Sequence, residues 1–290
     1  MKRILVPVDF STHTNVSCRY AIDISRSART EIILFHSFFD QFYYSDGGFS
    51  TGFESGIMMT DEIILDLYKQ KEKKLNDLVE ELTSNLNEEV TSNITISCRM
   101  ESGNPEVQII HALEQLNPDL IVMGSSGMGK KGILAGSVAR RIIDSTQIPV
   151  IAVPEMEKNP VLKNIAYMTT FNPGDVQVIQ EIDRILSAFQ VNIFCLHLTG
   201  SDPDAAALMK MNSLSDNQAV KNFEGRISFH VLENDQEKET LQNFISSNQI
   251  SLIAFIPRKR NIFKNLFYQG ITRNDLFQTQ IPILAVRPVK

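Results

Sequence analysis

A glycine-rich loop that leads into a helix is the part of this sequence whose residue types could do chemistry. In the stretch 119–142, the apolar run from Leu120 to Met123 is typical of a strand buried on both faces. Residues 124, 127, 129, 132 and 136 are glycines, which let a backbone turn tightly with its N–H groups exposed. Ser137 can cap the next helix, and the positive end of a helix favours a phosphate. The stretch therefore predicts an anion site.

A carboxylate, Asp9, directly follows the first apolar run of the chain. Ligands of open α/β sheets bind beyond the carboxyl ends of the strands, where a carboxylate can accept hydrogen bonds from an exocyclic amine or a ribose hydroxyl. The alternative is that Asp9 only caps the turn before the first helix. For the glycine-rich loop, the alternative is a tight connection without a ligand.

Other catalytic patterns find little support. The run GSSGMGKK fits a P-loop up to Lys130, but Lys131 stands where a hydroxyl should hold Mg²⁺. These two lysines could serve as point charges for phosphates or simply be solvated. His36 and His197 end apolar strands and are interpreted as structural histidines. Neither a nucleophile elbow nor a dinucleotide fingerprint follows the first strand, and no general base is identified.

Length, composition and charge exclude several classes of protein. A chain of 290 residues with 43% apolar side chains suits two α/β domains. The net charge of -6 disfavours broad electrostatic capture of nucleic acid or of an anionic membrane. Three scattered cysteines fit a reducing compartment better than a disulfide framework or a zinc site. The chain shows no signal peptide and no apolar run long enough for a membrane span, so we expect a cytoplasmic protein.

Short apolar runs alternate with amphipathic segments along the first half. We expect strands at Arg3–Val8, Glu31–Ser37, Ile94–Cys98, Leu120–Met123 and Pro149–Val153. We expect helices at Thr14–Ala28, Asp61–Leu86, Pro105–Leu116 and Ser137–Ser145. This alternation predicts an α/β fold, a five-stranded parallel sheet with helices on both faces.

The same order of runs repeats in the second half, which indicates a duplicated domain. The run 193–198 matches 32–37 and places His197 where His36 stands. In the same way, 251–256 parallels 119–124, and 281–288 parallels 148–154. We predict one domain over 1–154 and a second over 161–290, joined by a short polar link that makes the copies pack closely.

Several motifs of the first half together resemble the universal stress protein family. They are ILVPVDFS at 4–11, LFHS at 34–37, GNPEVQII at 103–110, DLIVMGSSG at 119–127, Gly-Ser at 136–137 and IPVIAVP at 148–154. The resemblance covers essentially the whole first half, and the second half follows its layout with weaker motifs. It implies a Rossmann-like, adenine-nucleotide-binding fold. The interval from Gly127 to Gly136 is one residue shorter than in the nucleotide-binding branch of the family.

Carried over residue by residue, the resemblance implies a site for ATP with Mg²⁺ in the first half. The adenosine end would be surrounded by Pro7, Asp9 and Ser37. The base and ribose would be lined by Met123 and Gly124. The phosphate contacts would come from Gly127, Gly136, Ser137 and Val138.

The second half has lost these residues. Thr170 stands in the place of Asp9 and Met168 in that of Pro7, and the segment after residue 256 keeps only Gly270. Without glycines a backbone is poorly suited to exposing successive N–H groups, so we expect no nucleotide there. The basic run at 258–264 is interpreted as a solvated face. The segment 40–59 has no counterpart in the second half and predicts a mobile loop, with a lid or a partner surface as the alternative.

Assembly can also be predicted. Single-domain members of the family commonly pair through their last strands, and here both copies of that strand, in 148–154 and 281–288, lie on one chain. We expect them to form an intramolecular pseudo-dimer that covers both strand edges, and homodimer formation by the whole chain stays open.

The sequence thus predicts a stress-response or regulatory protein that binds ATP in its first domain, with binding as the main event. The alternative from the enzyme class is a slow ATP hydrolase, for which no base is identified. A third interpretation is a structural interaction protein that binds no nucleotide, and the shortened glycine spacing favours it. A protein partner is compatible with the first interpretation, whereas nucleic-acid and membrane partners are not expected.

Overall fold

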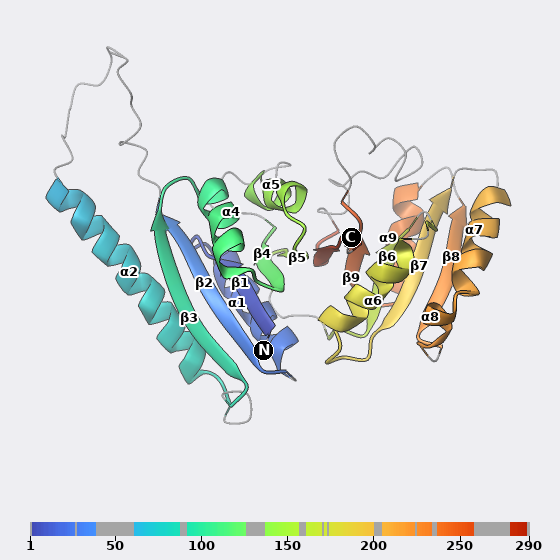
Figure 1. Ribbon diagram of the computed structural model, residues 1–290, viewed down its shortest axis with the longest axis horizontal. Coiled ribbons are helices and arrows are strands. Elements are labelled where there is room, and N and C mark those ends of the chain that lie inside the picture. Colours follow the sequence, from blue (N-terminus) through green and yellow to red (C-terminus); the bar gives the residue numbers. More distant parts are fainter. Residues whose placement is uncertain are drawn as a thin grey trace, which may run out of the picture.

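The computed structural model describes most of the chain. The described residues are 2–26, 28–38, 61–87, 92–125, 137–156, 161–169, 171–172, 174–199, 205–223, 225–233, 237–257 and 279–288. Within these residues, ten strands form a single sheet with helices on both faces (Figure 1). The glycine-rich loop at 126–136 and the segment 39–60 lie outside the described residues, and so does the basic run at 258–264.

The helices and strands alternate in both halves of the chain. The strands of the first half are β1 (Lys2–Pro7), β2 (Thr30–Phe38), β3 (Ile94–Ser102), β4 (Leu120–Gly124) and β5 (Val150–Val153). Its helices are α1 (Thr12–Ser25), α2 (Asp61–Ser84), α4 (Pro105–Leu116) and α5 (Ser137–Ser145). The strands of the second half are β6 (Asn164–Met168), β7 (Asn192–Thr199), β8 (Ile227–Glu233), β9 (Ile250–Phe255) and β10 (Ile283–Ala285). Its helices are α6 (Asp175–Ile185), α7 (Ala205–Ser215), α8 (Gln218–Lys221) and α9 (Glu237–Ser247).

The strand order confirms the predicted parallel α/β architecture. The order is β3-β2-β1-β4-β5 in the first half, followed by its mirror image, β10-β9-β6-β7-β8. Neighbouring strands within each half are parallel. Where the halves meet, the strands of one half run opposite to those of the other, because β10 pairs antiparallel with β5 (Figure 1).

The two halves meet through their last strands, which confirms the predicted intramolecular pairing. Strand β10 pairs antiparallel with β5, and Leu284 lies opposite Ile151. Each strand covers an edge that would otherwise expose unpaired backbone N–H and C=O groups. The sheet is therefore continuous from β3 at one edge to β8 at the other.

Two apolar cores lie on the two faces of the sheet, and each contains residues of both halves. One core contains buried side chains of α1, α2 and α6, such as Val16, Leu75 and Ile179. The other contains buried side chains of α4, α5 and α9, such as Ile109, Ile142 and Leu241. Because both cores cross the joint between β5 and β10, the halves pack closely, as the short link predicted.

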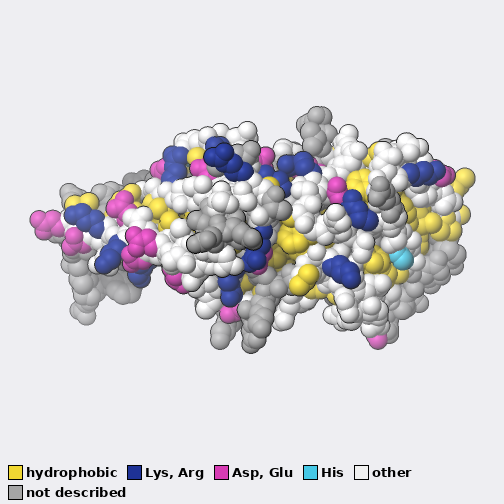
Figure 2. All heavy atoms as spheres, turned by 90° about the horizontal axis from the view of Figure 1, so that it is seen from below, with side chains coloured by type: hydrophobic (Ala, Val, Ile, Leu, Met, Phe, Trp, Pro, Cys, Tyr) yellow, Lys and Arg dark blue, Asp and Glu magenta, His cyan; other side chains and the backbone are white. Residues whose placement is uncertain are grey.

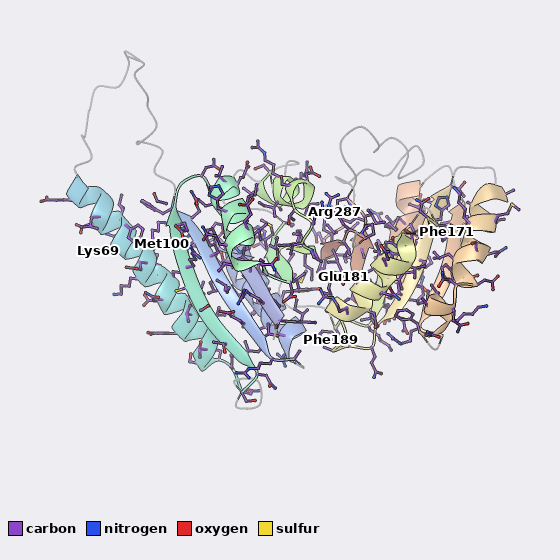
Figure 3. All side chains as sticks on the ribbon, in the orientation of Figure 1. Lys69, Met100, Phe171, Glu181, Phe189 and Arg287 are labelled. Atoms are coloured by element: carbon purple, nitrogen blue, oxygen red, sulfur yellow. The ribbon has the colours of Figure 1, made fainter. Side chains whose placement is uncertain are left out.

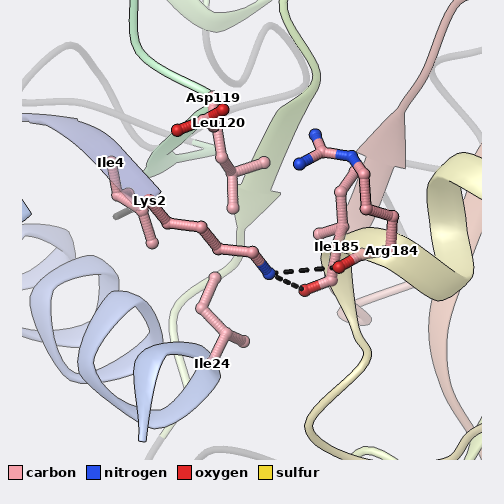
Figure 4. A pocket seen from close by; sticks show the side chains of 7 residues that line it. All are labelled: Lys2, Ile4, Ile24, Asp119, Leu120, Arg184 and Ile185. Carbon is pink, nitrogen blue, oxygen red and sulfur yellow. Dashed lines mark hydrogen bonds between the residues drawn. The ribbon is translucent and has the colours of Figure 1, made fainter. Parts of the chain in front are cut away.

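A charged contact also crosses the joint between the halves, at the first residue of β1. The Lys2 ammonium donates to the carbonyl oxygens of Arg184 and Ile185, at distances of 3.1 and 3.2 Å (Figure 4). These carbonyls lie at the carboxyl end of α6, where a cation is favourable. Burial, followed by the neighbouring Arg184 charge, lowers the pKa of Lys2.

Charges of both signs are distributed over the surface seen from below. In Figure 2, basic and acidic side chains are interspersed over the first half, at the left of the view. A mixed surface of this kind does not produce a field of one sign. None of the helices in the described part of the chain is long and apolar enough to cross a membrane.

Candidate functional site

The strand order of the first half has its switch point between β1 and β4, and the edge of the sheet beyond the carboxyl ends of these two strands is here called the crevice. From β1 the chain continues outward to β2 and β3, whereas β4 continues to β5 on the other side. In open α/β sheets, ligands bind beyond the carboxyl ends of the strands at such a switch point. Because Ile4 pairs with Leu120 and Leu5 with Ile121, these two strands end side by side.

Asp9 follows the end of β1, and its carboxylate is fixed by the start of α1. Its Oδ1 accepts hydrogen bonds from the Ser11 N–H at 3.0 Å, the Ser11 hydroxyl at 2.6 Å and the Thr14 hydroxyl at 3.1 Å. The turn-capping role considered for Asp9 is therefore present in the structure. These bonds also hold the carboxylate at the mouth of the crevice, and a carboxylate can accept about four hydrogen bonds in all.

Pro7 and Ser37 lie on the adjacent strands β1 and β2. Pro7 is the last residue of β1. The Ser37 hydroxyl donates to the Gly103 carbonyl oxygen at 2.6 Å. Gly103 has a φ of 133° and its N–H donates to the Phe38 carbonyl oxygen at 2.9 Å, so Ser37 and Gly103 tie the end of β2 to the start of α4.

Met123 and Gly124 end β4, on the other side of the crevice from Asp9. The Met123 side chain is buried in the core beneath α4 and α5. Gly124 is half-buried and lies opposite Val153 of β5. The N–H of Ser125 still donates to the Val153 carbonyl oxygen at 2.8 Å, so the backbone stays in the sheet up to this residue.

Helix α5 begins at Ser137, directly after the glycine-rich loop. Its bounds, Ser137–Ser145, agree with the helix predicted from the sequence, for which Ser137 was also considered as a cap. Buried Ala139, Ile142 and Ile143 fix the helix on the sheet, and Val138 packs partly against the same core. The first N–H groups of a helix have no partner within it, so this end can bind an anion. The predicted phosphate contacts Gly127 and Gly136 lie outside the described residues.

A cluster of Phe10, His36 and Lys71 lies next to Asp9 and was not predicted. The Phe10 ring centroid lies 4.5 Å from that of His36, and the Lys71 nitrogen lies 5.5 Å from the centroid of Phe10. His36 Nδ1 is 2.8 Å from the Val8 carbonyl oxygen. Burial lowers the pKa of His36, and the Lys71 charge adds to this, whereas the Val8 bond and Asp9 act in the opposite direction. Lys71 therefore brings a positive charge close to the crevice.

The corresponding turn of the second half is closed by a different carboxylate. Asp175, 1% exposed, accepts hydrogen bonds from the Tyr167 hydroxyl at 2.7 Å and the Asn172 N–H at 2.8 Å. The Thr169 hydroxyl also donates to this carboxylate. Thr170, the counterpart of Asp9, lies outside the described residues. The carboxylate in this half is therefore directed into the protein interior.

A metal centre made only of protein side chains is not seen in the described part of the chain. No group of three or more His, Cys, Asp or Glu side chains there could hold a metal ion. Cys18 and Cys195 are buried, and burial raises the pKa of both thiols. Since the thiolate is the form that binds metals and attacks substrates, these two cysteines are suited to packing.

An open, Rossmann-like α/β sheet with a crevice at its switch point thus defines the class of this protein. The sequence model described as "Universal stress protein family" matches residues 1–154. The chain belongs to the universal stress protein family.

Two relatives from Methanocaldococcus jannaschii each match about half of the chain. Universal stress protein MJ0531 is 28% identical over 160 residues, which cover 54% of this chain and 84% of the relative. Universal stress protein MJ0577 is 25% identical over 154 residues, which cover 52% of this chain and 94% of the relative.

One solved structure is similar along nearly the whole chain. A universal stress protein from Archaeoglobus fulgidus aligns over 99% of this chain and 96% of its own, with a TM-score of 0.71 and 18% identity. At this identity the likeness concerns the fold, which this chain and that protein share over both halves.

Proposed function

We propose that this chain binds ATP, together with Mg²⁺, in its first half and acts as a nucleotide-responsive stress or regulatory module. The observation that carries the proposal is the meeting of three features at one edge of the sheet. Asp9 is fixed at the end of β1, Gly124 ends the adjacent β4, and α5 begins at Ser137 after the connection from β4. A carboxylate beside a helix amino terminus suits a ligand that carries both hydrogen-bond donors and phosphates.

The residues present fit an adenine nucleotide. Asp9 would accept hydrogen bonds from the adenosine end, near Pro7 and the Ser37 hydroxyl. The small Gly124 would let the ligand approach the backbone closely. Ser137 and Val138, with Gly127 and Gly136 of the preceding loop, would contact the phosphates. Mg²⁺ would enter with the phosphates, as is usual for this ion when the protein supplies few ligands.

We propose further that the chain consists of two units, 1–154 and 161–290, and that the second unit does not bind nucleotide. The buried Asp175 supports this proposal because it is only 1% exposed and its hydrogen bonds are made inside the turn, so the carboxylate does not face a ligand. The loss of glycines after residue 256 supports it independently. The second unit would therefore serve as a partner for the sheet of the first.

Binding is the proposed event, and hydrolysis is expected to be slow. The histidine nearest to the crevice, His36, is buried and is held by the Val8 carbonyl, so it is poorly suited to activating a water molecule. We expect turnover far below the roughly 10 per second of a typical enzyme. A measured turnover of several ATP per second would place the protein in the enzyme class instead.

Titration calorimetry of the full chain with ATP and Mg²⁺ tests the proposal. We expect a stoichiometry near one nucleotide per chain, because only the first unit keeps the site. Two equivalent sites would contradict the assignment of the second unit. The absence of any heat at millimolar ATP would overturn the proposed function itself.

A further inference from the structure

An arginine of the second half, Arg287, holds the far end of the helix that begins the proposed phosphate site. Arg287 lies two residues after the end of β10, between the two halves (Figure 3). Its Nη2 lies 3.1 Å from the Ile143 carbonyl oxygen and 3.4 Å from that of Asp144. Its Nε donates to the Thr146 carbonyl oxygen at 3.0 Å. All three carbonyls lie at or just beyond the carboxyl end of α5.

These contacts satisfy backbone groups that the helix itself leaves unpaired. The last four carbonyls of a helix lack partners within it. In α5, the Ile142 carbonyl accepts the Thr146 N–H at 3.1 Å, and Arg287 serves Ile143 and Asp144. A guanidinium also complements the negative end of the helix dipole, and its planar fork can serve several oxygens at once.

The same guanidinium is anchored in the second half. Its Nη1 donates to the Pro257 carbonyl oxygen at 2.6 Å, just after the end of β9. The Val286 N–H, next in sequence, donates to the Phe255 carbonyl oxygen at 3.0 Å. Arg287 is therefore fixed to β9 by its own bond and by its neighbour, and it joins this strand end to α5.

We propose that Arg287 is a positioning residue for the phosphate end of the nucleotide site, an inference that rests on the proposed function. Helix α5 has only nine residues, about 13 Å at 1.5 Å per residue, and moves as one rigid piece. Fixing its carboxyl end therefore fixes the direction of its amino end at Ser137. In this way the second half shapes a site whose ligand it does not contact.

The coupling works in both directions. If holding α5 favours phosphate binding, bound phosphate must favour the arrangement in which Arg287 holds α5, because coupling free energies are reciprocal. ATP should therefore slow hydrogen exchange at the end of α5 and at the amide of Val286. Adenosine, which lacks the phosphates, should have little effect on either segment.

The chain offers a matched control on the other side of the joint. Lys2 caps the carboxyl end of α6 across the same interface, as Arg287 caps α5. Helix α6 carries no proposed ligand, so Lys2→Ala disturbs the joint without disturbing the phosphate end. Arg287→Lys keeps the charge but loses the planar fork, and it should fall between the wild type and Arg287→Ala.

Calorimetry of the full-length variants with ATP and with adenosine tests the proposal. Arg287→Ala should weaken ATP binding about fivefold, the scale of a charge at a helix end, and should change adenosine binding less than about twofold. Lys2→Ala should change neither. An equal loss for both ligands, or no loss for ATP, would overturn the role of Arg287. A wild type that binds no ATP would overturn the proposed function instead.

Hydrogen exchange of the wild type gives a second test that does not depend on a folded variant. Protection by ATP of residues 142–146 and of Val286, with no such protection by adenosine, would support the coupling. If ATP binds the wild type without slowing exchange in either segment, the coupling is overturned.

Discussion

The two halves of the molecule share a turn after their first strand, down to details that have no part in ligand binding. Phe10 and Phe171 both adopt positive φ, at 59° and 53°. Behind them, His36 and His197 lie 2.8 and 2.9 Å from the carbonyl oxygens of Val8 and Thr169. Each Phe ring contacts the histidine of its own half. A feature that both halves keep, although the proposed ligand residues are present in only one of them, belongs to the fold. The hydrogen bonds of both histidines therefore fit the structural role that the sequence analysis predicted.

The halves differ in where the carboxylate of this turn lies. In the first half, Asp9 follows the strand and Thr14, on the helix, donates to it. In the second half, Asp175 is on the helix, in the place of Thr14, and Thr169, at the strand end, donates to it. The carboxylate thus follows the strand in the first half and lies on the helix in the second, where its donor Thr169 stands in the place of Val8 and not of Asp9. Only the arrangement of the first half leaves a carboxylate at the mouth of the crevice.

The largest expected effect comes from separating the halves. A chain shortened after Glu155 should dimerise or precipitate, because β5 then loses Ile283, Leu284 and Ala285 as its edge partners. Size-exclusion chromatography with light scattering, run beside the full chain, would show this. A stable monomer at high concentration would mean that the halves do not protect each other's edges.

Removing the buried carboxylate should strongly destabilise the second half. Asp175→Ala leaves the Tyr167 and Thr169 hydroxyls and the Asn172 N–H without their acceptor, and should lower the free energy of unfolding by about 3 kcal/mol. The matched change Thr14→Ala removes one donor from Asp9 and should cost about 1 kcal/mol. Urea unfolding measures both. Equal costs for the two variants would refute the contrast drawn between the turns.

Removing the carboxylate of the first half should affect the ligand more than the fold. Asp9→Ala should weaken ATP binding by about 1 to 3 kcal/mol, the cost of losing a charged hydrogen bond. Its effect on the free energy of unfolding should stay near 1 kcal/mol, the usual cost of losing a cap. Asp9→Asn keeps an oxygen acceptor for Ser11 but not the charge, so its ATP affinity should lie between those of the wild type and Asp9→Ala. If Asp9→Ala binds ATP as tightly as the wild type, the role of Asp9 is only to hold the turn through its hydrogen bonds.

The smallest expected effect is a pH dependence from His36. Because its pKa in the folded protein lies below the ordinary value of 6.5, the unfolded chain takes up this proton first on acidification. The free energy of unfolding should therefore be insensitive to His36 above about pH 7 and fall below pH 6.5, levelling off below the folded pKa. His36→Asn should reduce the slope between about pH 7.5 and 5.5. Burial also lowers the pKa of His230, so some slope should remain. An unchanged slope in the variant would contradict the assignment.

The sequence by itself determined most of the elements and their parallel arrangement. Apolar runs such as 120–123 and 251–256 lie in buried strands, and their neighbours within each half pair parallel, as the alternation of runs predicted. These signals are local, since periodicity and apolar runs depend on neighbours in sequence. Boundaries were less accurate: the first helix, expected at 14–28, is Thr12–Ser25, because Asp9 and Ser11 start it earlier than its apolar stripe indicated. The glycine-rich loop lies outside the described residues, so its predicted contacts stay predictions.

Only the tertiary structure decided which charged side chains matter around the crevice. Lys71 is one of many charged residues of α2, and packing alone brings it to Phe10. Arg287 sits in a motif that indicated only a final strand, yet it reaches the Ile143 carbonyl oxygen, 144 positions earlier in the chain. The sequence did not indicate that Asp175 supplies the carboxylate of the second turn, because its hydrogen-bond donors come from the preceding strand and turn. A long charged side chain can reach many partners, and tertiary packing selects one of them. The packing of α2 selects Phe10 for Lys71, and the pairing of β5 with β10 selects the end of α5 for Arg287.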